Sequence, residues 1–192
     1  MSRKFPLIPT VIVLAAVATM IGLGLWQLDR KAEKEALLAY YDGALDNPAA
    51  VNFPLTDADP QRWLYRQSTL ECREVLSQGA MSGRNTSGEA GWAMAAQCAV
   101  DGGEAEIAIG WSRNPTPPEW NGGTVTGTIA PLGETVRLVA NEPQAGLEPL
   151  AKPNPSEIPN NHWAYAIQWF FFAATALVIY ALALKRRLAR KG

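Results

Sequence analysis

The sequence predicts a membrane protein in which two transmembrane α-helices flank a small β-rich extracytoplasmic domain, an α+β antiparallel barrel or sandwich. Three observations predict it. The segments 5–28 and 158–184 contain no Asp, Glu, Lys or Arg, and each exceeds the roughly 20 residues that a helix needs to cross a hydrocarbon core. All 18 acidic residues lie between these segments. The same stretch contains short β-branched runs separated by Gly, Asn, Asp and Pro, a pattern typical of strands.

The charged ends of the chain predict its orientation. Seven basic residues and no acidic residue lie before the first apolar segment and after the second, and an excess of Lys and Arg marks the cytoplasmic side. We therefore expect a cytoplasmic N-terminus (1–5), a first transmembrane helix (6–28), a periplasmic domain (29–160), a second transmembrane helix (161–184) and a cytoplasmic basic tail (185–192). The lipid bilayer is thus an expected partner. The domain has ten basic against 18 acidic residues, so nucleic acid is not an expected partner.

A signal peptide is the alternative interpretation of the N-terminus. Arg3 and Lys4 precede an apolar run, and the small residues 16–18 resemble a cleavage site. The apolar run continues for about ten residues past that site, which favours a helix that stays in the membrane. Because no Arg- and Ser-rich presequence precedes this span, we expect a bacterial inner membrane rather than that of an organelle.

The domain begins with a helical stretch and continues as strands. Residues 29–45 keep a helical composition. Three prolines within 47–60 then end the helix, because each disfavours the helical conformation of the residue before it. The strand-like segments that follow are 62–74, 92–100, 105–111, 123–129 and 135–139. The clearest hairpin lies at Asp101, Gly102 and Gly103, where glycine permits the positive φ of a tight turn. These short strands predict the antiparallel barrel or sandwich.

The two cysteines leave three interpretations open. Cys72 and Cys98 lie in separate predicted strands on the expected oxidising side of the membrane, which suits a structural disulfide. Free buried thiols are the second interpretation. A copper or zinc site is the third, but it would require more closely spaced soft ligands than this pair provides. A Ser-His-Asp hydrolase is disfavoured, because the single His lies at the membrane edge.

That single histidine, His162, marks the start of the second transmembrane helix. Asparagine is a favoured N-cap, so Asn160 and Asn161 place His162 in the first turn. The electropositive helix terminus favours a neutral imidazole with a lone pair free for a metal. Tyr165 and Trp169 follow on or near the same helix face, where they would flank a planar iron macrocycle. The alternative is that His162, Trp26, Trp163 and Trp169 only anchor the helices at the membrane interface.

Two sequence motifs, one that begins at the end of the first apolar segment and one within the second, resemble the Surfeit locus 1 family of cytochrome c oxidase assembly proteins. They are GLWQLDRKAEK at 24–34 and NNHWAYAIQWF at 160–170. The order of segments along the chain is also similar. The resemblance implies a non-enzymatic role: an assembly factor for aa3-type oxidases that binds haem a and assists its insertion into subunit I. In the middle of the chain only Gly110 and Trp111 match the family pattern well.

The resemblance also implies which residues contact haem a. It assigns iron ligation to His162 and matches Asn161, Tyr165 and Trp169 on the second helix, and Trp26, Gln27 and Arg30 on the first. We expect an asparagine to orient the metal-bound imidazole by a hydrogen bond. We further expect Arg30 to pair with a haem propionate, because guanidinium binds carboxylate through two parallel hydrogen bonds.

Two other functions remain as alternatives. The first is a haem-independent scaffold that stabilises an oxidase assembly intermediate through protein contacts. The second is an unrelated sensor domain with two spans, which would make the paired motifs a coincidence. For the expected haem carrier, the resemblance implies contact with cytochrome c oxidase subunit I or with the haem a synthase. Loss of haem in a His162→Ala protein that still supports oxidase assembly would favour the scaffold.

Overall fold

A computed structural model describes residues 6–189 of the chain. They divide into two compact units, one containing residues up to 37 and from 159 onward, the other residues 38–158. The expected N-terminal segment 1–5 and the last three residues of the expected basic tail lie outside the described residues. Within 6–189, two helices are long and apolar enough to cross a membrane, with mean hydropathies of 2.3 and 2.0. Two apolar helices flanking a folded domain fit a membrane protein.

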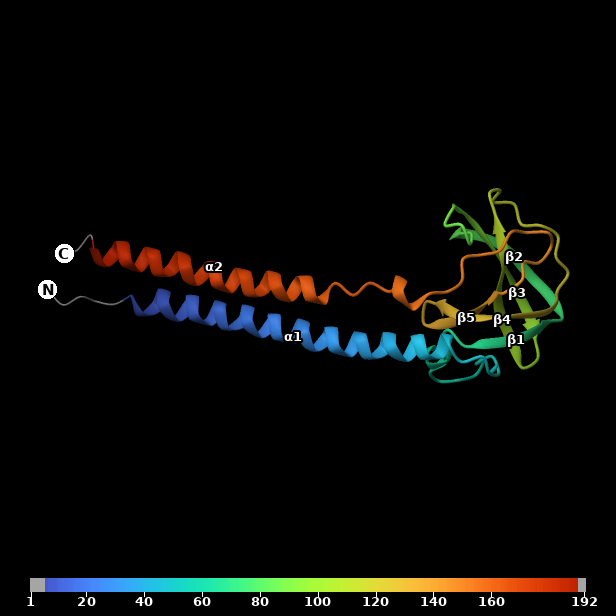
Figure 1. The fold of residues 1–192 in the computed structure, drawn as a ribbon, viewed down its shortest axis with the longest axis horizontal. Helices are drawn as coiled ribbons and strands as arrows, with labels where there is room; N and C mark the ends of the chain where they lie inside the picture. Colours follow the sequence, from blue (N-terminus) through green and yellow to red (C-terminus); the bar gives the residue numbers. More distant parts are fainter. Residues whose placement is uncertain (1–5, 190–192) are drawn as a thin grey trace. The chain divides into compact units, whose positions relative to one another are not determined.

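The first unit is an antiparallel pair of helices, α1 (Leu7–Leu45) and α2 (His162–Ala189), of which α1 ends in the second unit. Figure 1 shows them side by side. On each helix of this unit, two buried residues lie seven positions apart, a spacing typical of coiled-coil packing. They are Val17 and Gly24 on α1, and Ala166 and Ala173 on α2. Small residues at such positions allow two backbones to approach closely in lipid. Large apolar side chains cover the outer faces, as a lipid-facing surface requires.

The expected helical stretch after the first span is confirmed, because α1 continues without a break to Leu45. Its last turns belong to the second unit. Tyr41 and Ala44 are buried there, and the Tyr41 ring lies 5.0 Å from that of Tyr65. Burial raises the pKa of both hydroxyls. The end of α1 is therefore part of the hydrophobic core of the domain.

The second unit is built on a mixed sheet within residues 38–158. Its strands are β1 (Gln67–Cys72), β2 (Glu74–Arg84), β3 (Ala90–Val100), β4 (Gly103–Ser112), β5 (Gly123–Leu132) and β6 (Thr135–Ala140). The order across the sheet is β1-β5-β6-β4-β3-β2. The β3–β4 hairpin turns at Asp101 and Gly102, as expected, and Gly102 has a φ of 91°.

Three features of the sheet differ from the sequence expectation. The pair β4–β6 is parallel, so the sheet is not purely antiparallel. Strand β2 was not expected, because its sequence between Val75 and Arg84 is rich in Ser, Gly and Ala, which carry little strand propensity. The segment 62–74 is not one strand: its start lies in the 3-10 helix η1 (Pro60–Trp63), and Tyr65 has a φ of 66°. A positive φ of that size interrupts an extended chain.

The sheet curls until its two ends meet. Strands β1 and β2 are at opposite ends of the strand order, about 24 Å apart in a flat sheet at the usual strand spacing. Only Arg73 separates them in the chain, and its N–H donates to the Ala99 carbonyl at 3.0 Å. The chain therefore passes from pairing with β5 to pairing with β3. This closure favours the barrel over the sandwich.

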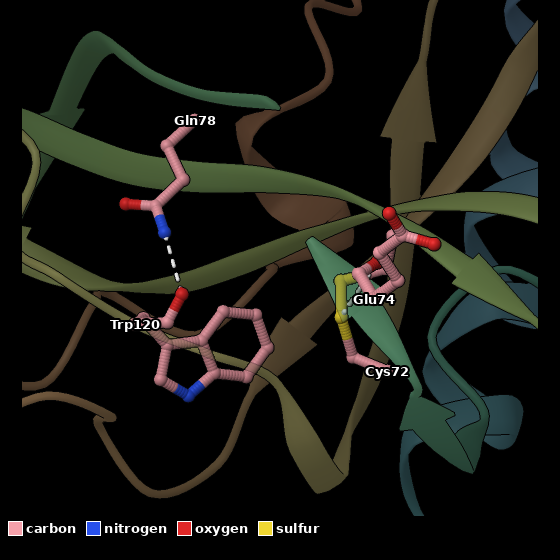
Figure 2. Close-up of a disulfide and its surroundings, with 5 residues drawn as sticks. Cys72, Glu74, Gln78 and Trp120 are labelled. Atoms are coloured by element: carbon pink, nitrogen blue, oxygen red, sulfur yellow. Dashed lines mark hydrogen bonds between the residues drawn. A yellow bond between two sulfur atoms is a disulfide. The ribbon is translucent and has the colours of Figure 1, made fainter. Parts of the chain in front are cut away.

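A disulfide links β1 to β3 where the sheet closes. Cys72 at the end of β1 is bonded to Cys98 in β3, with Cα atoms 5.3 Å apart, so the disulfide interpretation is the one that the structure supports. Figure 2 shows the bond beside Gln78, whose side chain donates to the Trp120 carbonyl at 2.8 Å. Both sulfurs belong to the buried core, together with apolar residues of the central strands such as Ile107, Ile129 and Leu138.

Candidate functional site

The candidate site begins where α2 begins. A proline-containing segment leads to Asn160 and Asn161, and α2 starts at His162, as the sequence predicted. The N–H of Tyr165 donates to the Asn161 carbonyl at 3.2 Å and closes the first helical turn. The remaining N–H groups of this turn have no partner within the helix and give its end a partial positive charge. His162 is therefore held at a helix terminus.

The antiparallel pairing of the helices places Gln27 opposite His162. Near the other end of the pair, the hydroxyls of Thr10 and Tyr180 form a hydrogen bond, and in between Gly24 contacts the Phe170 ring. These contacts define one register along both helices. Gln27 lies three residues after Gly24, on the face of α1 that meets α2.

The central contact of the site is a hydrogen bond between the two helices. His162 Nδ1 lies 2.8 Å from Gln27 Oε1, across 135 residues of sequence. An amide oxygen only accepts, so Nδ1 carries the proton and donates it. An imidazole in this tautomer has its lone pair on Nε2. Both side chains are half-buried. The arrangement presents one imidazole nitrogen in a defined orientation, ready to act as a ligand.

Gln27, and not an asparagine, is the hydrogen-bond partner of His162. We expected an asparagine to orient the ring, but Asn161 is exposed and within residues 6–189 neither it nor Asn160 bonds to the imidazole. The amide oxygen of Asn160 is buried and has no hydrogen-bond partner among the described residues. A signal for Gln27 was present in the sequence: it is a polar residue three positions after Gly24, a spacing that places both residues on one face of a helix.

The aromatic residues expected at the site lie on the same two helices but differ in exposure. Trp26 and Tyr165 are each 52% exposed. Trp169 is half-buried and meets Phe172 edge to face, with ring centroids 6.2 Å apart. Trp169 is two helical turns from His162 on nearly the same face of α2. These rings provide apolar surface around the start of α2.

Arg30 is one turn beyond Gln27 on α1 and is exposed. Its Nη1 lies 2.5 Å from the Glu33 carboxylate, and about half of the side chain remains accessible. The next cation, Lys31, pairs in the same way with Glu35 at 2.6 Å. Such exposed pairs stabilise a helix weakly. Arg30 can therefore exchange its carboxylate partner at little cost.

A separate cavity of about 680 Å³ lies in the second unit. Its walls include Phe53, Leu55 and Trp63, and its polar groups include Asp57 and Asp101. The Trp63 indole N–H donates to Asp57 Oδ2 at 2.8 Å, and the Asp59 N–H donates to Oδ1 at 3.0 Å. These two hydrogen bonds, the indole first, lower the pKa of the Asp57 carboxyl. No local sequence pattern predicts this cavity, because its walls come from segments that are distant in the sequence.

Within 6–189 no three His, Cys, Asp or Glu side chains gather as ligands for a metal ion. The sulfurs of Cys72 and Cys98 are bonded to each other. His162 is the single histidine of the sequence.

The comparison with protein families agrees with the motifs on the two helices. The model of the SURF1 family matches residues 14–174, which is most of the chain and includes the facing portions of both helices. This is the Surfeit locus 1 family that the sequence motifs predict, so that expectation is confirmed. A comparison with curated proteins finds no match.

Proposed function

Because this chain belongs to the SURF1 family, which is associated with cytochrome oxidase assembly, we propose that it holds haem a for insertion into subunit I of an aa3-type oxidase. Members of this family are assembly factors rather than enzymes. The proposal therefore requires a binding site on the membrane helices and a domain that meets partner proteins. It requires no catalytic group.

The hydrogen bond between His162 and Gln27 carries the haem part of this proposal. With Nδ1 donating at 2.8 Å to Gln27, Nε2 retains the lone pair. Histidine is a usual axial ligand of haem iron, and metal-bound imidazoles generally donate their other N–H to an acceptor. His162 would hold the iron through Nε2, and Gln27 would keep the ring in place.

The surrounding groups fit a haem by their chemistry. Tyr165 and Trp169 offer aromatic surface on the α2 side, and Trp26 offers it on α1. The amide oxygen of Asn160 is buried and has no hydrogen-bond partner among the described residues. A bound group could donate the hydrogen bond that this oxygen lacks. When bound, haem would supply an iron for His162 to hold and acidic propionates for a cationic side chain to pair with. Arg30 would pair with a propionate in place of Glu33.

The proposed location follows from the arrangement of charges in the sequence, and the proposed partners follow from the family. The chain would lie in a bacterial inner membrane, with both termini in the cytoplasm and the barrel domain in the periplasm. The domain would contact subunit I of the oxidase, or the haem a synthase from which haem a is received. One histidine provides one axial bond, which suits a carrier because transfer requires a finite rate of release.

The test is the absorption and pyridine haemochrome spectrum of the protein purified from cells that make haem a. We expect haem a in the wild type, its loss in His162→Ala, and its retention in Trp163→Ala, which changes the exposed neighbouring residue. Thermal unfolding of each variant controls for misfolding. A wild-type protein without haem, or a His162→Ala protein that lacks haem and fully supports oxidase assembly, would contradict the carrier and favour the scaffold.

A further inference from the structure

The hydrogen-bond acceptor that faces His162 is a neutral amide. Many metal-binding histidines donate instead to a carboxylate, which raises the basicity of the ring. Here Gln27 Oε1 is the acceptor, at 2.8 Å from Nδ1. The difference is one atom, because glutamate would have nearly the same shape and would add a negative charge. An amide at this position therefore leaves the imidazole less basic, and a weaker metal ligand, than a carboxylate would.

The carboxylates nearby on α1 have other partners or are exposed. Glu33 pairs with Arg30, and Glu35 pairs with Lys31. Asp29 is exposed and lies two residues after Gln27, a spacing that directs it to another face of the helix. Among residues 6–189, His162 forms no ion pair, and Gln27 is its side-chain hydrogen-bond partner. The imidazole thus has an oriented but uncharged neighbour.

We propose that Gln27 is a positioning residue that keeps the hold of His162 on haem iron weak enough for release; this inference rests on the proposed function. The amide fixes the ring so that Nε2 is the ligand. Because it carries no charge, it draws on the Nδ1 proton less than a carboxylate does, and the ring donates fewer electrons to the iron. Partners of this kind change metal affinity by about 10–100-fold. Gln27 would thereby set the lifetime of the bound state.

The experiment compares the wild type with Gln27→Glu and Gln27→Leu, all as full-length protein in detergent. Glutamate keeps the shape and adds charge, whereas leucine removes the acceptor. The probe is haem a, and its release is followed by transfer to excess apomyoglobin. We expect release from Gln27→Glu to be about tenfold slower, with a more negative ferric/ferrous midpoint potential. We expect Gln27→Leu to release haem a faster than the wild type.

A second measurement reads the hydrogen bond without haem. The chain contains one histidine, so protein labelled with ¹⁵N-histidine and purified without a histidine tag gives one pair of imidazole nitrogen signals, from Nδ1 and Nε2, in nuclear magnetic resonance spectra. At pH 8, where an ordinary imidazole is neutral, the wild type should show a protonated Nδ1. Gln27→Leu should lose this preference. A protonated Nε2 in the wild type, or an unchanged spectrum in Gln27→Leu, would overturn the inference, because it would contradict the hydrogen bond from Nδ1 to Gln27.

The two proposals fail in different ways. Equal release rates and equal potentials in the wild type and Gln27→Glu, with haem a bound to both, overturn the role of Gln27 and leave the carrier intact. A wild type that takes up no haem a overturns the carrier, and the inference with it, even where the spectrum shows a protonated Nδ1. Gln27→Leu tests the inference independently if Gln27→Glu does not fold.

Discussion

Gly24 on α1 lies directly against the aromatic ring of Phe170 on α2. A Cβ atom built at Gly24 would overlap three atoms of that ring, so a hydrogen is what the space admits. Gln27 is three residues further along α1, and its partner His162 is two turns before Phe170 on α2. The close approach at Gly24 therefore helps to hold the helices in the register that joins Gln27 to His162.

Substitution of Gly24 by alanine should weaken the helix pair. The added methyl group must displace the Phe170 ring, and overpacking of this kind costs about 1–3 kcal/mol. The matched control is Gly22→Ala, where an added Cβ meets nothing within 4 Å. It gives the same gain in helix propensity without the clash. We expect a lower thermal unfolding midpoint for Gly24→Ala than for Gly22→Ala, and equal midpoints would contradict the packing.

Removal of the disulfide should destabilise the barrel. The Cys72–Cys98 bond joins residues 26 apart in the sequence, and a loop of this length corresponds to about 3.5 kcal/mol of stability in the chain-entropy account. Denaturant unfolding of the Cys72→Ala/Cys98→Ala protein should show this loss, as should the wild type in reductant. Reductant should not change the double variant. A wild type insensitive to reduction would show that the bond adds little to stability.

The domain should lose part of its stability in acid through Asp57. Hydrogen bonds from Trp63 and Asp59 lower the pKa of this carboxyl in the folded state. Its contribution is therefore complete above the ordinary carboxyl pKa and is lost as the pH falls through the folded value. We expect Asp57→Asn to be less stable than the wild type at pH 7, with the difference shrinking toward pH 3. A difference that does not depend on pH would contradict this account.

Substitution of Gly110 by alanine should disturb the end of β4. A Cβ atom there would lie 2.5 Å from the Leu147 Cβ and 3.2 Å from the Glu148 carbonyl oxygen. Both belong to the segment that pairs with Trp111, whose N–H donates to the same carbonyl at 2.7 Å. We expect a loss of about 1–3 kcal/mol in unfolding free energy. Gly79→Ala, where a Cβ meets nothing within 4 Å, is the control and should be near neutral.

Replacement of Arg30 by glutamine should speed the release of haem a and leave the protein in the membrane. The reason is loss of a guanidinium that would pair with a propionate. Lys31→Gln is the matched control, because Lys31 also pairs with a glutamate of α1 through an exposed contact. The rate of haem a transfer to excess apomyoglobin is measured for both variants and for the wild type. Equal rates for Arg30→Gln and the wild type would exclude the propionate contact.

Many elements of the fold were predictable because they depend on local patterns. Long uncharged runs identify the two apolar helices, and glycines identify the β3–β4 turn. Strand β2 was missed because its Ser, Gly and Ala residues have no strand preference of their own, and it exists through pairing with β3. The parallel pair β4–β6 also depends on distant contacts, which no local pattern encodes.

The sequence by itself determined the family, the apolar helices and the placement of His162 in the first turn of α2, because caps, charges and hydrophobic length act within a few residues. Only the tertiary structure decided that Cys72 and Cys98 are bonded, and that Gln27 is the partner of His162. Each of these pairs joins distant positions. Their distance depends on how β1 meets β3 and on how α1 packs against α2, and packing is a property of the whole fold.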